Sequence, residues 1–212
     1  TAALLAASSP TGWVYGCDRD GDALRAAQDR LAEFAGRFEL RRGNFSELAD
    51  WVPAGSCDGV LLDLGVSSPQ LDRAERGFSF SQDGPLDMRM DVRQGMTAAE
   101  LVNTASVEEL ARIFWELADE RDSRRLARAI VMDREKVPFR TTRQLAELIE
   151  RISPRRGKTH PATKVFQALR LAVNDELGSL KAGLAGALRI LRSGGRLAVI
   201  TRRHTERGTF AP

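Results

Sequence analysis

The residues best suited to chemistry lie between positions 58 and 72 of this 212-residue chain. An apolar run at 60–62 predicts a strand of a parallel sheet that is covered on both faces, and Asp63 follows at its carboxyl end. Open α/β sheets bind their ligands at that edge, so an acid there indicates an enzyme site. The simpler alternative is that Asp63 only caps a turn.

The segment after this acid predicts a rigid loop that holds a flat polar group. Gly65 permits a tight turn, and Pro69 fixes the backbone just before the amide of Gln70. Ser67 and Ser68 add hydroxyl groups. Ordinary loop chemistry is the alternative interpretation of these residues.

The stretch 73–91 has no helical or strand period, which makes it a long loop for a compact domain. Loops of this length are usually functional or disordered, and apolar side chains argue against disorder. Those side chains are Phe78, Phe80, Leu86, Met88 and Met90.

Two earlier strands, at 13–17 and 38–42, end in residues suited to nucleotide binding. Asp18 follows the first strand, and its two carboxylate oxygens match the vicinal hydroxyls of a ribose. Phe45 follows the second strand, where an aromatic ring can stack on adenine or simply pack in the core. Asn44 beside it can bond a purine edge or hold the loop.

The order of elements predicts an α/β fold with a doubly wound parallel sheet. Strands and helices alternate in the first part of the chain, and a last strand is expected at 196–201. Helical patterns alone occupy 96–161. We therefore expect a sheet domain formed by 1–95 and 162–212, with 96–161 inserted as a small helical domain.

Several helices are marked by their ends or by their apolar face. Asp22 is the expected cap of a helix that ends at Gly36. Pairs of a hydroxyl and a carboxylate with capping-box spacing begin helices at Thr97 and Ser106. A late helix is expected to bury four leucines on one face: Leu177, Leu180, Leu184 and Leu188.

The composition is that of an ordinary globular protein. Hydrophobic residues make up 42% of the chain, no apolar run approaches the length of a membrane span, and no signal peptide is visible, so we expect a cytoplasmic location. Cys17 and Cys57 fall in or beside predicted strands and are expected to be reduced core thiols. Their spacing argues against a disulfide or a metal pair.

The net charge of +3, from 32 basic and 29 acidic residues, is too small to identify a nucleic-acid binder. The distribution of cations is more informative. A cluster at 121–128 could be a solvated helix face. The stretch at 155–161 lies next to the predicted domain junction, and a solvated linker is its alternative interpretation. His160 could be a base or a helix-entry residue. The predicted nucleic-acid contacts there are Arg155, Arg156, Lys158 and His160.

Three blocks, at 63–72, 76–80 and 85–91, resemble the signature of the RsmH (MraW) family of bacterial methyltransferases that act on small-subunit ribosomal RNA. Segments at 160–170 and 173–177 resemble further blocks of that family. The resemblance implies a Rossmann-like class I methyltransferase fold. It also implies transfer of a methyl group from S-adenosylmethionine to the exocyclic N4 of a cytosine in the decoding centre of 16S ribosomal RNA.

The resemblance assigns roles to the residues at the strand ends. Asp63 or the backbone of Ser67, Ser68 and Pro69 could accept a hydrogen bond from the cytosine amino group and favour its attacking form. Asp63 can equally orient an amino group of the cofactor, and we weight that role more heavily. The cofactor-binding residues are then Asp18, Asn44, Phe45, Asp63 and Gln70. The catalytic residues are Asp63, Ser67, Ser68 and Pro69.

The sequence departs from the family pattern at both ends. No strand with a Gly-Gly-His loop precedes Thr1, and the last strand runs into 202–212 instead of a Phe-His-Ser-Leu-Glu-type block. We therefore expect a fragment or a sequence with gaps. Two other functions stay open: a methyltransferase of protein side-chain amides, and a noncatalytic RNA-binding or assembly module.

Overall fold

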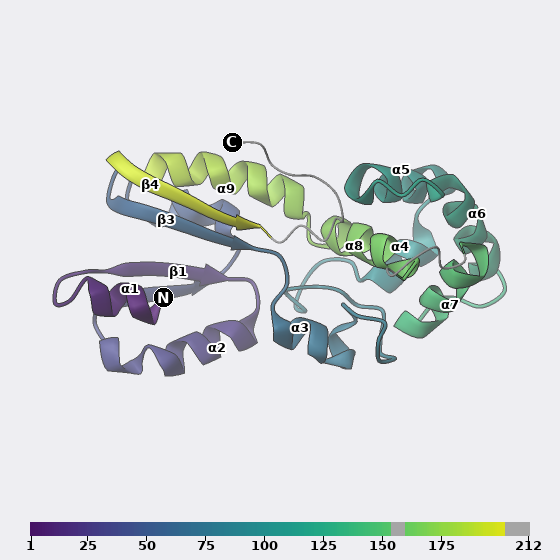
Figure 1. Ribbon diagram of the computed structural model, residues 1–212, viewed down its shortest axis with the longest axis horizontal. Coiled ribbons are helices and arrows are strands. Elements are labelled where there is room, and N and C mark those ends of the chain that lie inside the picture. The colour runs from purple at the N-terminus through teal and green to yellow at the C-terminus, as the bar shows by residue number, and fades with distance from the viewer. Residues whose placement is uncertain (154–159, 202–212) are drawn as a thin grey trace.

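The computed structural model describes residues 1–153 and 160–201, which form a mixed α/β molecule. Figure 1 shows an elongated shape in which strands and their helices occupy one end and helices alone occupy the other. Among the described residues, no helix combines the length and the apolar character needed to cross a membrane.

The strands in the described part of the chain pair in parallel, as predicted. β1 (Val14–Asp18) pairs with β2 (Phe38–Arg42), and β3 (Cys57–Leu64) pairs with β4 (Leu191–Thr201). The expected continuous sheet is not formed within these residues, because the strands make two separate two-stranded sheets. β1 and β3 nevertheless run in the same direction in Figure 1, and their side chains share one hydrophobic cluster.

Strand β3 is buried on one face only. Val60 and Leu62 are 9% and 4% exposed, whereas Leu61 between them is 53% exposed. The prediction of a strand covered on both faces is therefore wrong. Successive side chains of a strand point to opposite faces, and the face that carries Leu61 and Ile200 is open to solvent.

Helices make up the rest of the described structure. The α/β part contains α1 (Ala2–Ala7), α2 (Gly21–Arg30), α3 (Ser68–Asp72) and α9 (Glu176–Ile190), with the 3-10 turns η1 (Ala32–Phe34), η2 (Phe45–Asp50) and η3 (Ala74–Arg76). The helical part contains α4 (Ala98–Thr104), α5 (Val107–Ala118), α6 (Ser123–Arg134), α7 (Thr142–Ile152) and α8 (Ala162–Val173).

The observed helix starts agree in part with those predicted from the sequence. Thr97 forms the predicted reciprocal capping box with Glu100, and the Ser106 hydroxyl accepts a backbone N–H at the start of α5. Asp20, and not Asp22, caps α2, because the Asp20 carboxylate accepts the Asp22 N–H.

The helical part has a core of its own, to which the irregular segment contributes Phe78, Leu86 and Met88.

Helix α9 buries small residues more completely than the four leucines that were predicted. Leu177 and Leu188 are 54% and 68% exposed, whereas Leu180 and Leu184 are half-buried and Leu184 packs against the hydrophobic cluster of the sheet, so the predicted leucine face is only partly buried. Small side chains on the buried side allow η2 to pack closely against the helix. The buried residues of α9 are Ser179, Gly183, Gly186, Ala187 and Ile190.

The predicted irregular stretch 73–91 contains the 3-10 turn η3 and, beyond it, no helix or strand apart from an isolated bridge between Pro85 and Thr141. Gly77 has a φ of 72°, and a Cβ at this residue would lie 2.2 Å from the Pro85 carbonyl oxygen. Met88 is fully buried and has a φ of 63°, which a non-glycine residue seldom adopts. Close packing around an unusual backbone therefore gives this long segment one conformation.

Candidate functional site

The polar residues predicted for the site lie at the carboxyl ends of the parallel strands. Asp18 is the last residue of β1, Asp63 lies at the end of β3, and Asn44 and Phe45 follow β2. In Figure 1 the ends of β1 and β3 point toward the helical part. These residues therefore border the junction between the two parts of the molecule.

Asp18 occupies the position expected of a ribose-binding acid. Its Oδ1 accepts a hydrogen bond from the Asp20 N–H at 2.8 Å. Partial burial raises the pKa of Asp18, the negative charge of Asp20 adds to the rise, and the N–H groups of Asp20 and Arg19 oppose it. Within the described residues no cation forms an ion pair with Asp18, so its carboxylate is available to hydroxyl donors.

Asn44 and Phe45 are both engaged in the structure of the loop after β2. The Asn44 Oδ1 accepts the Ser46 N–H at 3.2 Å, and its Nδ2 donates to the buried Ser179 hydroxyl at 2.7 Å. Phe45 is half-buried, and a Cβ added to Gly183 would lie 2.3 Å from its ring. Asn44 thus holds the loop, and Phe45 packs on α9 with part of its surface still accessible.

The predicted serine-proline loop is the beginning of a short helix. Ser67 precedes α3, and Ser68 and Pro69 form its first turn. The Gln70 side chain turns back, so that its Oε1 accepts the Ser67 N–H at 3.0 Å. Serine followed three residues later by glutamine is a capping-box signal, and it was present in the sequence although we predicted a loop there. Asp63 and both serines are exposed.

Gln70 is 6% exposed and links this helix to the end of β1. Its Nε2 donates to Asp20 Oδ2 at 2.9 Å, and the Arg76 guanidinium donates to the same oxygen at 2.7 Å. Arg76 also donates to the carbonyl oxygens of Arg89 and Met90. We did not predict a site role for Asp20 or Arg76 from the sequence. Asp20 stands just before a predicted helix, and Arg76 begins the family block at 76–80.

The Asp20 carboxylate is kept ionised by these contacts. Burial alone would raise its pKa, but hydrogen bonds from Gln70, Arg76 and the Asp22 N–H lower it, and the net shift is downward. A charged, nearly buried group is therefore fixed between the end of β1 and the start of α3.

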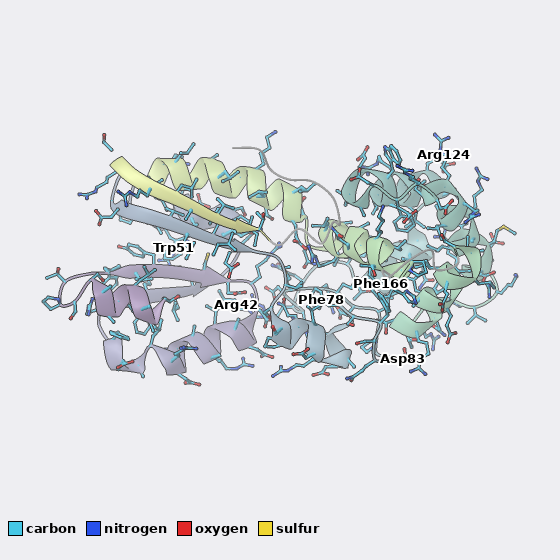
Figure 2. All side chains as sticks on the ribbon, in the orientation of Figure 1. Arg42, Trp51, Phe78, Asp83, Arg124 and Phe166 are labelled. Atoms are coloured by element: carbon cyan, nitrogen blue, oxygen red, sulfur yellow. The ribbon has the colours of Figure 1, made fainter. Side chains whose placement is uncertain are left out.

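A second set of contacts holds the irregular segment against the strand ends. Asn174, which is 5% exposed, donates to the Met88 carbonyl oxygen and accepts the Met90 N–H, each at 2.8 Å. The backbone carbonyl oxygen of Asn174 accepts a hydrogen bond from the Arg19 guanidinium at 2.6 Å. Asp91 is buried and pairs with Arg42 at 2.9 Å. Figure 2 shows Arg42 beside the end of the lower pair of strands.

The predicted RNA-binding residues are only partly described. Arg155, Arg156 and Lys158 lie outside the described residues. The His160 Nδ1 accepts the Ala162 N–H at 3.1 Å, so His160 takes the predicted helix-entry position before α8. The centroid of its ring lies 4.7 Å from that of the Phe80 ring, and the Phe80 ring in turn packs edge-on against Phe166.

Comparisons with known proteins give one family. Residues 1–207 match the family model described as the MraW methylase family. Three similar proteins come from Symbiobacterium thermophilum (53% identical over 206 residues), Sinorhizobium fredii (52% over 203) and Syntrophotalea carbinolica (53% over 205). Each of them is named ribosomal RNA small subunit methyltransferase H.

The aligned regions cover most of this chain and a smaller share of the relatives. They include 94%, 95% and 93% of the chain, in the same order, and 65%, 58% and 65% of the relatives. The chain therefore spans about three fifths of the length of the curated relatives that it matches.

Proposed function

Since this chain belongs to the MraW methylase family, we propose that it carries the methyl-transfer site of a ribosomal RNA methyltransferase. The proposed reaction moves a methyl group from S-adenosylmethionine to the exocyclic N4 of a cytosine in small-subunit (16S) ribosomal RNA. The observation that carries the proposal is the position of the family's signature block, which begins with Asp63 at the carboxyl edge of β3. The names of the relatives support the RNA substrate, and the resemblance of the motifs supports the target cytosine.

The proposed fold is a Rossmann-like class I methyltransferase. Residues 1–95 and 162–212 would form its cofactor-binding domain, and residues 96–161 an inserted helical domain for substrate recognition. Parallel pairing and the separate helical core support this division. Within the described residues β1 and β3 each keep an unpaired edge, and a first strand of the family type between them would join the two sheets. The side chains of α8 and Phe78 extend the helical core beyond these boundaries.

The strand-end residues fit the proposed cofactor. S-adenosylmethionine supplies a methyl group on a positively charged sulfur, which is an activated leaving group. Asp18 carries no neutralising cation in the described part of the chain and would bind the ribose hydroxyls. The accessible part of Phe45 would contact the adenine, with Asn44 fixing its loop. Gln70 would act indirectly, because both ends of its amide are already bonded.

The acceptor nitrogen needs orientation more than it needs a strong base. The exocyclic amine of cytosine is a poor nucleophile, because its lone pair is delocalised into the ring. Asp63 would accept a hydrogen bond from this amine or orient the amino group of the cofactor. Ser67, Ser68 and the backbone at Pro69 would surround the same group. Such positioning can contribute about 7–11 kcal/mol in favourable cases.

The substrate is expected to be single-stranded or locally opened RNA, because base pairing hides the amine. Contacts of Arg155, Arg156 and Lys158 with its phosphates stay a prediction, as does an RNA contact of His160. A ribosomal substrate would place the reaction in the cytoplasm.

The deciding experiment uses the full-length protein and small ribosomal subunits that lack the modification. Labelled S-adenosylmethionine should transfer its methyl group to RNA, and Asp63→Asn should reduce transfer strongly. Asp58→Asn is the matched control, because Asp58 is an exposed acid at the other end of β3, paired with Arg192. Label in ribosomal protein would favour an amide methyltransferase. RNA binding without cofactor binding in calorimetry would favour a noncatalytic module.

A further inference from the structure

We infer that the exposed face of α6 is an RNA-contacting surface that binds substrate phosphates away from the reacting base. The inference rests on the proposed function, since it takes RNA as the substrate. We name this surface the α6 arginine face. Its members are Arg121, Arg124, Arg125 and Arg128.

The geometry of the helix places these side chains together. α6 begins at Ser123, and its buried side chains include Leu126 and Ile130. Residues three and four positions apart lie on one side of a helix, so Arg124, Arg125 and Arg128 align on the side opposite the core, and Arg121 lies in the turn that precedes the helix. All four are exposed. Figure 2 shows Arg124 at the outer edge of the helical part.

The positive charge of this face is largely uncompensated. Arg125 pairs with Asp122 at 3.1 Å, but among the described residues the other three arginines form no ion pair. Two arginines on neighbouring helices are paired. On α5, Arg112 pairs with Glu116, and on α7, Arg151 pairs with Asp133. Among the described residues the exposed Arg143 of α7 forms no ion pair either, so the distinguishing feature of the α6 arginine face is the clustering of its cations.

Local helix stability does not account for the arginines. The start of a helix carries a partial positive charge, so acids are favoured there and cations are not. The first turn of α6 contains no acid, and the carboxylate of its cap, Asp122, makes no capping hydrogen bond. Residues that break a local rule without a structural gain are expected at functional positions. Guanidinium groups are well suited to phosphate, which they bind through two parallel hydrogen bonds.

The position of α6 defines which part of the substrate it could reach. In Figure 1 this helix lies in the helical part, at the end of the molecule opposite the strands. Phosphates bound there belong to nucleotides other than the one that is methylated. The α6 arginine face would thus strengthen binding of long RNA without reading its sequence.

The experiment compares two triple variants of the full-length protein. The test variant is Arg121→Gln/Arg124→Gln/Arg128→Gln. The control, Arg30→Gln/Lys181→Gln/Arg189→Gln, removes three exposed cations from α2 and α9. Dissociation constants for unmodified small-subunit ribosomal RNA are measured over a range of salt concentrations, together with the melting temperature of each protein.

The test variant should lower the slope of log affinity against log salt by about 2, since each phosphate contact contributes about 0.7 for single strands. Affinity at 0.1 M salt should then fall on the order of 100-fold. The control should keep the wild-type slope. The melting temperature of the test variant should be unchanged or higher, because cations leave the start of a helix.

A wild-type slope for the test variant would overturn the inference, as would an equal loss in the control. These outcomes are separable from failure of the proposed function. If the wild type methylates RNA and the test variant keeps its slope, only the α6 arginine face is refuted. If the wild type neither methylates nor binds RNA, both proposals fail.

Discussion

Arg76 and Asp20 form an ion pair of 2.7 Å whose side chains are 11% and 8% exposed. Asp20 follows β1 on the proposed cofactor side, and Arg76 ends η3 on the proposed acceptor side. The pair thus fixes two parts of the candidate site relative to each other. Gln70 reinforces the link by donating to the same Asp20 oxygen.

Arg76→Met should lower the free energy of unfolding of the full-length protein by about 3–5 kcal/mol, because it leaves the Asp20 charge buried without its partner. Adding Asp20→Asn should recover part of this loss. Denaturant titrations measure both effects. Arg73→Met is the control, since Arg73 pairs with Asp22 at the surface, and its loss should stay within about 1 kcal/mol. Equal losses in the two single variants would contradict the importance of burial.

Acid should destabilise the protein partly through Asp20. The pKa of this carboxyl is lowered in the folded state from its ordinary value of 3.8, so its contribution to stability is present above that value and is lost as the pH falls through the folded pKa. Unfolding free energies measured between neutral pH and strong acid should therefore decline less steeply for Asp20→Asn than for the wild type. Parallel curves for the two proteins would refute this contribution.

Gly183→Ala and Gly186→Ala should have opposite effects, although both lie on the buried face of α9. The new Cβ at Gly183 would lie 2.3 Å from the Phe45 ring, whereas at Gly186 the nearest atom is at 3.6 Å. We expect overpacking to cost Gly183→Ala about 1–3 kcal/mol. Helix propensity should make Gly186→Ala neutral or more stable by up to about 1 kcal/mol.

The same pair of variants tests the proposed contact of Phe45 with the cofactor. Calorimetry with S-adenosylmethionine should show weaker binding for Gly183→Ala and wild-type binding for Gly186→Ala. If displacement of Phe45 destabilises the fold but leaves cofactor affinity intact, Phe45 is a packing residue only.

Cys17 should be chemically inert in the folded protein. Burial raises the pKa of this thiol to about 12, and the negative charges of Asp18 and Glu47 add to the rise. The reactive thiolate is therefore scarce at neutral pH. Iodoacetamide at pH 8 should label Cys17 only after unfolding in urea, as mass spectrometry of the peptide would detect. Rapid labelling of the native protein would contradict this expectation.

Features that depend on local sequence were predicted well. Strands, most helix starts and the irregular segment follow from periodicity and capping residues, which act over a few positions. The buried face of α9 was not predicted, because it depends on the fit between Gly183 and the distant Phe45 ring. Hydrophobicity alone favoured a face of four leucines, of which Leu177 and Leu188 are exposed.

In the candidate site, too, local features were predicted and contacts between distant residues were not. The placement of Asp18 and Asp63 at strand ends follows from the chain order alone. The Asp20, Gln70 and Arg76 contacts join residues 50 and 56 positions apart, and no short pattern encodes such a link. Gln70 is an example: its bonds to Ser67 and Asp20 were not predicted, and its role toward the cofactor stays a prediction.

The unpaired edges of β1 and β3 have a practical consequence for handling this part of the protein. Each edge of the described sheets presents free backbone donors and acceptors, and such edges are templates for pairing with another extended chain. Preparations limited to these residues should self-associate as their concentration rises. An added synthetic β-strand peptide should compete with that aggregation and keep the preparation clear.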